Sequence, residues 1–142
     1  MTNPYLTQAQ FVDFIVEAGQ AVVSTVDPQG RPEAALVELA VTPAGDLLFN
    51  TKTATRKVVN LSHNPHVAVV VGWPSITLQI EGEAVRLEGA DLDAAASVFS
   101  ARFPKKSLDW SAFSLYRVRP EWLRYCALQP GSPSIIAEGL PA

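Results

Sequence analysis

The spacing of hydrophobic residues predicts three amphipathic helices in this chain. The first has apolar side chains at positions 11, 14, 15 and 18, between a capping box of Thr7 and Gln10 and a terminating Gly19. The second is short, places apolar residues at 54, 58 and 61 on one face, and ends before the Asn-Pro pair at 64–65. The third covers residues 91–103.

Stretches of aliphatic and β-branched residues predict short strands between and after these helices. Tight turns at residues 27–30 and 43–46 join the first three strands into an antiparallel meander. The expected strands are 21–26, 34–41, 47–49, 66–73, 76–87, 112–119 and 121–128, with the last two separated by Pro120.

Two of these strands carry further information about the sheet. The valine-rich strand at 66–73 is continuous enough to be buried on both faces. In the strand at 76–87 the apolar positions change parity around Gly82, which predicts a β-bulge. Because strands and helices do not alternate regularly, we expect a mainly β fold, an antiparallel barrel of six or seven strands with two or three peripheral helices.

Composition indicates one globular domain over residues 1–142, with extended arms expected at 1–6 and 130–142. Of the 142 residues, 48% are hydrophobic and 18% are charged, and the formal net charge of −3 favours neither nucleic acid nor an anionic membrane as a partner. Cys126 is the single cysteine, the first residues lack the pattern of a signal peptide, and the longest apolar run is too short to cross a bilayer. We therefore expect a cytoplasmic protein.

Several classes of site lack their sequence signatures. One cysteine and two histidines, His63 and His66, do not supply a zinc set, so no metal site is expected. The chain has no G-x-G-x-x-G sequence, no Walker A sequence and no nucleophile elbow. The sequence therefore leaves the catalytic residues unassigned.

The segment 49–61 is the most informative for function. A strand runs into a hydroxyl-rich turn containing Thr51, Thr53 and Thr55, and the short helix then opens with Arg56 and Lys57. Helices usually favour acidic residues in their first turn, whereas free amides, hydroxyls and cations together suit a phosphate or another dianion. The alternative is a solvated helix start without a ligand.

The order of these features resembles the pyridoxamine 5′-phosphate oxidase-like flavoproteins, which are FMN-binding split β-barrels. The resemblance spans roughly residues 15–128, and it depends on the order and spacing of several short pieces. These are residues 24–32 (STVDPQGRP), 47–51 (LLFNT), 55–57 (TRK), 60–61 (NL), 64–69 (NPHVAV), 78–82 (LQIEG) and 116–120 (YRVRP).

The resemblance implies a set of cofactor contacts and a homodimer with FMN at the subunit interface. It implies that the FMN phosphate is held by Thr55, Arg56 and Lys57, and that backbone groups of Leu36 and Val37 lie along the flavin. Asn50 and Thr51 would line the cofactor, and Gln79 would reach its polar edge from the facing subunit.

The sequence also departs from the oxidase pattern on the substrate side. Ala35 stands where the oxidase has an arginine, and residues 127–131 (ALQPG) lack its closing Arg-x-His motif. Arg102 matches a substrate-phosphate arginine of the family, but Val98 replaces the neighbouring tyrosine. Trp110 either contacts a flavin edge or packs over the end of the barrel. Pyridoxamine phosphate is therefore not the expected substrate.

Four functions remain open from the sequence. The first is an FMN-dependent oxidoreductase acting on an unidentified small molecule, and the second is a reductase that uses the deazaflavin coenzyme. For that longer, acidic coenzyme, Lys52 or the cations at 102–106 could supply further contacts. The third is a noncatalytic flavin-binding protein, and the fourth is a barrel that binds another anion or no ligand at this position.

Overall fold

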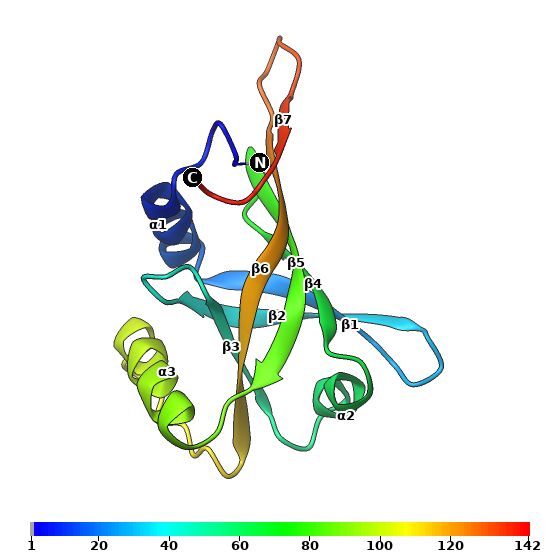
Figure 1. Cartoon of the computed structure of the whole chain (residues 1–142), viewed down its shortest axis with the longest axis vertical. Helices are drawn as coiled ribbons and strands as arrows, with labels where there is room; N and C mark the ends of the chain where they lie inside the picture. Colours follow the sequence, from blue (N-terminus) through cyan, green and yellow to red (C-terminus); the bar gives the residue numbers. More distant parts are fainter. Residues whose placement is uncertain (1) are drawn as a thin grey trace.

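The computed structural model describes residues 2–142 and shows a closed antiparallel barrel with three helices on its outside (Figure 1). The sheet has seven strands in the order β3-β2-β1-β4-β5-β6-β7, and β3 also pairs with β6, which closes the barrel. The expected fold class is confirmed. The elements are α1 (Gln8–Ala18), β1 (Gln20–Val26), β2 (Pro32–Val41), β3 (Leu47–Lys52), α2 (Arg56–His63), β4 (His66–Val71), β5 (Ile76–Arg86), α3 (Gly89–Arg102), β6 (Phe113–Ala127) and β7 (Ile135–Glu138).

The three helices form where the hydrophobic spacing predicts them, except that α2 begins at Arg56 and leaves Ala54 in the preceding turn. Thr7 and Gln10 make the expected capping box at the start of α1, and Gly19 ends this helix in the left-handed conformation with φ of 66°. α3 packs Ala95 and Phe99 against the outside of the barrel, over Leu48 and Leu115. α2 and α3 lie on opposite sides of the lower half of β6 (Figure 1).

The β4 strand corrects one expectation from the sequence. Its burial alternates, with Val67, Val69 and Val71 inside the barrel and Ala68 and Val70 on the outer face. The side chains that fill the barrel interior bury one face of this strand, and the side chains on its other face remain exposed. A run of valines is therefore compatible with one buried and one open face.

The bulge lies where the sequence places it, but its extra residue is on the neighbouring strand. The β5–β6 register shifts between Glu81 and Gly82, and Glu121 of β6 is left without a Cα partner on β5. The inward parity of β5 continues unchanged from Leu78 to Ala84. The parity switch inferred for β5 was therefore wrong, although the bulge itself is confirmed.

β6 is one continuous strand, so the expected break at Pro120 was wrong. β6 pairs with β3 over residues 113–118 and with β7 over residues 124–127. Pro120 lies between these two stretches, where β6 pairs only with β5 among the described residues, so its missing N–H need not cost a hydrogen bond of the sheet.

Both terminal segments lie against the barrel. The tail forms β7, which pairs with the end of β6, and Thr2 makes a parallel bridge to Leu140. Asn3 is buried, and its side-chain amide donates a hydrogen bond to the carbonyl oxygen of Ala137 over 3.1 Å. Within the described residues, no helix has the length and apolar character needed to cross a membrane.

We predict that Gly82→Ala destabilises the barrel at the bulge. A Cβ at this position would lie 2.5 Å from the carbonyl oxygen of Arg119, so the β5–β6 backbone must shift. The expected loss is about 1–3 kcal/mol of unfolding free energy, measured by urea denaturation. Glu83→Ala, at an exposed position of the same strand, is the control and should change stability little. Equal stability of the two variants would contradict this account.

Candidate cofactor site

Hydroxyl contacts hold the loop between β3 and α2 against the barrel. Thr51 is buried on β3, and its Oγ1 lies 3.1 Å from Oγ1 of Thr55, the N-cap residue of α2. Thr53 is bound twice to the segment around the start of β6, through its Oγ1 to Oγ of Ser114 (2.9 Å) and through its N–H to the carbonyl oxygen of Ala112 (2.9 Å). These contacts fix where α2 begins.

The first turn of α2 carries positive charge and has no side-chain cap. The hydroxyl of Thr55 makes no capping hydrogen bond to the first-turn amides, and that turn contains no acidic residue. The first amides of a helix have no partner within it, so they remain available to a ligand. The Thr55 hydroxyl, Arg56 and Lys57 stand at the same end of the helix.

The structure adds Glu33 to this site, a residue that the sequence analysis missed. Its Oε2 pairs with Nη2 of Arg56, and its Oε1 accepts a hydrogen bond of 2.8 Å from Nδ2 of Asn60. Nδ2 of Asn60 also lies 3.0 Å from Oγ1 of Thr25, and both of these residues are buried. The sequence did contain a signal, because Glu33 shares the parity of the buried Val37 and Leu39 on β2.

The two cations of α2 are therefore not equivalent. Arg56 is engaged by Glu33, although 81% of its side chain is exposed. Among residues 2–142, Lys57 makes no ion pair. The site consequently carries less free positive charge than the sequence suggests.

Two cavities adjoin the Arg56–Glu33 pair. One has a volume of about 380 Å³ and lies between β1, β2 and the start of α2, and the other, of about 470 Å³, lies under the β1–β2 hairpin. Both are lined by Glu33, Thr55 and Arg56. The first is lined in addition by Val23, Thr25, Ala34, Ala35 and Lys57.

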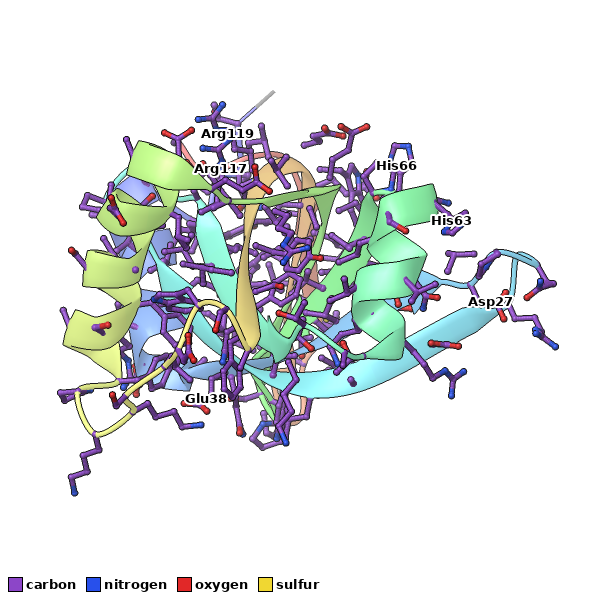
Figure 2. All side chains as sticks on the ribbon, turned by 90° about the horizontal axis from the view of Figure 1, so that it is seen from below. Asp27, Glu38, His63, His66, Arg117 and Arg119 are labelled. Atoms are coloured by element: carbon purple, nitrogen blue, oxygen red, sulfur yellow. The ribbon has the colours of Figure 1, made fainter. Side chains whose placement is uncertain are left out.

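The turn at the tip of the β1–β2 hairpin contains an ion pair between Asp27 and Arg31. Asp27 accepts hydrogen bonds from the backbone N–H of Arg31 (2.8 Å) and from Nε of Arg31 (2.7 Å). These bonds, the backbone one first, lower the pKa of the Asp27 carboxyl, so it stays ionised and paired with Arg31. Figure 2 shows Asp27 in the hairpin that extends past α2.

The other expected cofactor residues occupy different places. Val37 is buried, and Asn50 is half-buried on β3 opposite Leu115. Leu36 and Gln79 lie on the outer face, in a row across four strands where Leu36 pairs with Val22, Val22 with Val70, and Val70 with Gln79. One chain thus brings Thr51, Thr55, Arg56 and Lys57 together and leaves Leu36 and Gln79 on its outer face.

Arg102 and Trp110 lie on the α3 side of the barrel. Nε and Nη2 of Arg102 donate hydrogen bonds of 3.2 and 2.9 Å to the carbonyl oxygen of Val16, near the end of α1. Trp110 packs edge-on against Phe99 of α3, with ring centroids 6.3 Å apart. Since α2 and α3 lie on opposite sides of β6, one chain does not bring these residues to the start of α2 (Figure 1).

The histidines take part in local contacts at the other end of α2 (Figure 2). Nδ1 of His63 lies 3.0 Å from the carbonyl oxygen of Val59, and Nε2 of His66 lies 3.7 Å from Oε1 of Glu83. Among residues 2–142, no three His, Cys, Asp or Glu side chains are grouped so that they could hold a metal ion.

Comparison with known proteins identifies the family. A family model described as pyridoxamine 5′-phosphate oxidase matches residues 7–127. The chain is 37% identical over 73 residues to the pyridoxine/pyridoxamine 5′-phosphate oxidase of Haemophilus influenzae, a match that covers 50% of this chain and 35% of that protein. It is 33% identical over 93 residues to the corresponding oxidase of Chromohalobacter salexigens, covering 66% of this chain and 41% of that protein. The chain thus spans less than half the length of these two relatives.

Solved structures share the fold at lower identity. A heme binding protein from Mycobacterium smegmatis superposes with a TM-score of 0.74 at 21% identity, covering 94% of this chain and 58% of that one. An FMN binding protein from Nostoc punctiforme gives 0.69 at 17%, covering 90% and 85%. An F420 reductase gives 0.64 at 21%, covering 78% and 93%. The family model extends over most of the chain, and the protein therefore belongs to the pyridoxamine 5′-phosphate oxidase family.

Proposed function

We propose that this protein binds FMN at the start of α2 and acts as an oxidoreductase on a small molecule other than pyridoxamine phosphate. The observation that carries the proposal is the 380 Å³ cavity lined by Thr55, Arg56 and Lys57 beside an uncapped helix start. Membership in the family and the FMN binding protein among the structural neighbours support this choice of ligand.

The donors at the site fit a phosphate group. Lys57 supplies a charge without an ion pair in the described chain, Thr55 supplies a hydroxyl, and the first-turn amides of α2 supply N–H groups. Each charge-assisted hydrogen bond contributes about 1.5–3 kcal/mol, less where solvent screens it. A few such bonds together with flavin contacts reach the roughly 8 kcal/mol of a micromolar complex.

A homodimer is part of the proposal, because the outer face of one chain leaves an apolar row uncovered. Leu36 is 61% and Val70 is 37% exposed on this face, and Gln79 continues the row. Nε of the adjacent Arg124 makes no hydrogen bond in the described chain, and its nearest charged partner is Oε1 of Glu138 at 3.9 Å. A second copy on this face would cover the apolar side chains and bring its own Gln79 toward the flavin.

The cofactor would supply hydride and electron transfer, as flavins do. The chain's own groups would bind the phosphate and exclude water. Ala35 lines the cavity where the oxidase has an arginine, which leaves room but removes a charge, and this is why we propose a different substrate. Within one chain, Arg102 and Trp110 lie on the α3 side of the barrel. In the proposed homodimer, they would contact the substrate at the cofactor site of the other subunit.

Use of the deazaflavin coenzyme is the second candidate, supported by the F420 reductase among the structural neighbours. Lys52 is exposed at the end of β3, next to the loop that precedes α2. Lys106, by contrast, is already paired with Glu38. The structure therefore offers this longer acidic ligand one further exposed cation close to the site.

We predict that Arg56→Ala combined with Lys57→Ala weakens FMN binding at least tenfold and leaves the fold intact. Tenfold corresponds to about 1.4 kcal/mol. The measurement is quenching of flavin fluorescence during titration, with circular dichroism to check folding. The control is Lys105→Ala combined with Lys106→Ala, which removes the same charge from the loop after α3. Unchanged affinity in the α2 variant would remove the proposed site.

A parallel titration decides between the two cofactors. We expect FMN to bind more than tenfold tighter than the deazaflavin coenzyme, because Lys57 is the one cation lining the cavity that makes no ion pair within residues 2–142. Lys52→Ala should leave the affinity for FMN unchanged. Tighter binding of the deazaflavin, lost in Lys52→Ala, would replace the FMN proposal by the second candidate.

We predict that Arg102→Ala lowers the unfolding free energy by about 1 kcal/mol even without any ligand. Its guanidinium holds the Val16 carbonyl oxygen and thereby joins α3 to the end of α1. Thermal unfolding measures this effect, and Lys105→Ala is the matched control from the exposed loop. A variant with unchanged stability but weaker substrate binding would instead support a purely substrate-directed role.

A further inference from the structure

The structure assigns a further role to Glu33 in the same site. We propose that its carboxylate is a built-in competitor for the phosphate of the ligand, because it occupies Arg56 when no ligand is bound and thereby limits the affinity for anions. This inference rests on the proposed function, since it concerns the ligand that binds at Thr55, Arg56 and Lys57.

The position of the carboxylate is fixed from two sides. Oε2 pairs with Arg56, and Oε1 accepts the 2.8 Å hydrogen bond from Asn60. Asn60 is only 2% exposed and is itself anchored to Thr25 in the core. The side chain of Glu33 is 19% exposed, whereas that of Arg56 is 81% exposed. Arg56 is therefore the partner that can move, and Glu33 is the one that stays.

Glu33 also lies on the wall of both cavities at the start of α2. It shares this position with Thr55 and Arg56, which are the residues expected to meet the phosphate. A phosphate bound there must either share the guanidinium with Glu33 or take it away. In both cases the phosphate gains less from Arg56 than it would gain from an unpaired guanidinium.

In the proposed competition, Glu33 and the phosphate group compete for Arg56, and the flavin ring takes no part. Glu33 should therefore lower the affinity for FMN and leave the affinity for riboflavin, which has no phosphate, unchanged. Like other exposed electrostatic effects, the difference should shrink as the salt concentration rises. These features separate the proposed role from a general structural effect of the residue.

The test is a titration of the full chain and its variants with FMN and with riboflavin at low salt. Glu33→Gln keeps an acceptor for Asn60 and removes the charge, and we expect it to bind FMN about tenfold tighter with unchanged riboflavin affinity. Glu38→Gln is the matched control, since Glu38 lies on the same strand, is paired with Lys106 and stands outside both cavities. It should leave both affinities unchanged.

A double-mutant experiment tests whether Glu33 affects FMN binding through Arg56. In Arg56→Ala, the gain from Glu33→Gln should fall to about threefold or less, because the shared partner is gone. Glu33→Ala should shift FMN affinity in the same direction as Glu33→Gln, so the result does not depend on how one variant folds. Thermal unfolding of each variant shows that the proteins compared are folded.

The outcomes separate this inference from the proposed function. Wild-type protein that binds FMN, with folded Glu33 variants that bind it equally or more weakly, overturns the role of Glu33 and leaves the FMN site standing. An equal gain for FMN and riboflavin also overturns it, because the effect is then not electrostatic. If neither the wild type nor any variant binds FMN, the proposed function fails and the inference fails with it.

Discussion

The pairing of β3 with β6 is the constraint on which the rest of this structure depends. It closes the sheet, and its register from Leu47–Val118 to Lys52–Phe113 fixes where β3 ends. The loop after β3 is then bound to the start of β6 through Thr53 and Ser114, so α2 begins at one defined place on the barrel. Because the residues of the candidate site come from the end of β3 and the first turn of α2, closure of the barrel also positions that site.

The charges at this site show how a fold changes the meaning of a sequence motif. Two adjacent cations at a helix start suggest a strongly positive pocket, yet the barrel places Glu33 beside Arg56 and leaves Lys57 without an ion pair in the described chain. A neighbouring carboxylate both orients a guanidinium and reduces the charge that it offers to a ligand. If the proposed site binds a phosphate, we therefore expect modest and reversible binding of one group rather than capture of a polyanion.

The outer face of the sheet is the second feature with a consequence for function. The row from Leu36 to Gln79 is apolar over three strands and ends in polar groups, and Leu36, Val70 and Gln79 are exposed in it. Contiguous exposed apolar side chains of this kind usually mark an interface. Leu36 and Gln79 do not line either cavity at the start of α2, and the proposed homodimer would give this face a partner.

The sequence by itself determined the three helices, the position of the bulge, the family and the segment that opens α2. Each of these is encoded locally, in hydrophobic spacing, caps or short motifs read over a few residues. Only the tertiary structure decided that β6 runs through Pro120, that one face of β4 is open, that Glu33 meets Arg56, and that Arg102 holds the end of α1. These depend on contacts between residues far apart in the chain, 23 positions for Glu33 with Arg56 and 86 for Arg102 with Val16. Local periodicity does not show which residues far apart in the chain will contact each other. The pairing of strands in the folded barrel decides those contacts.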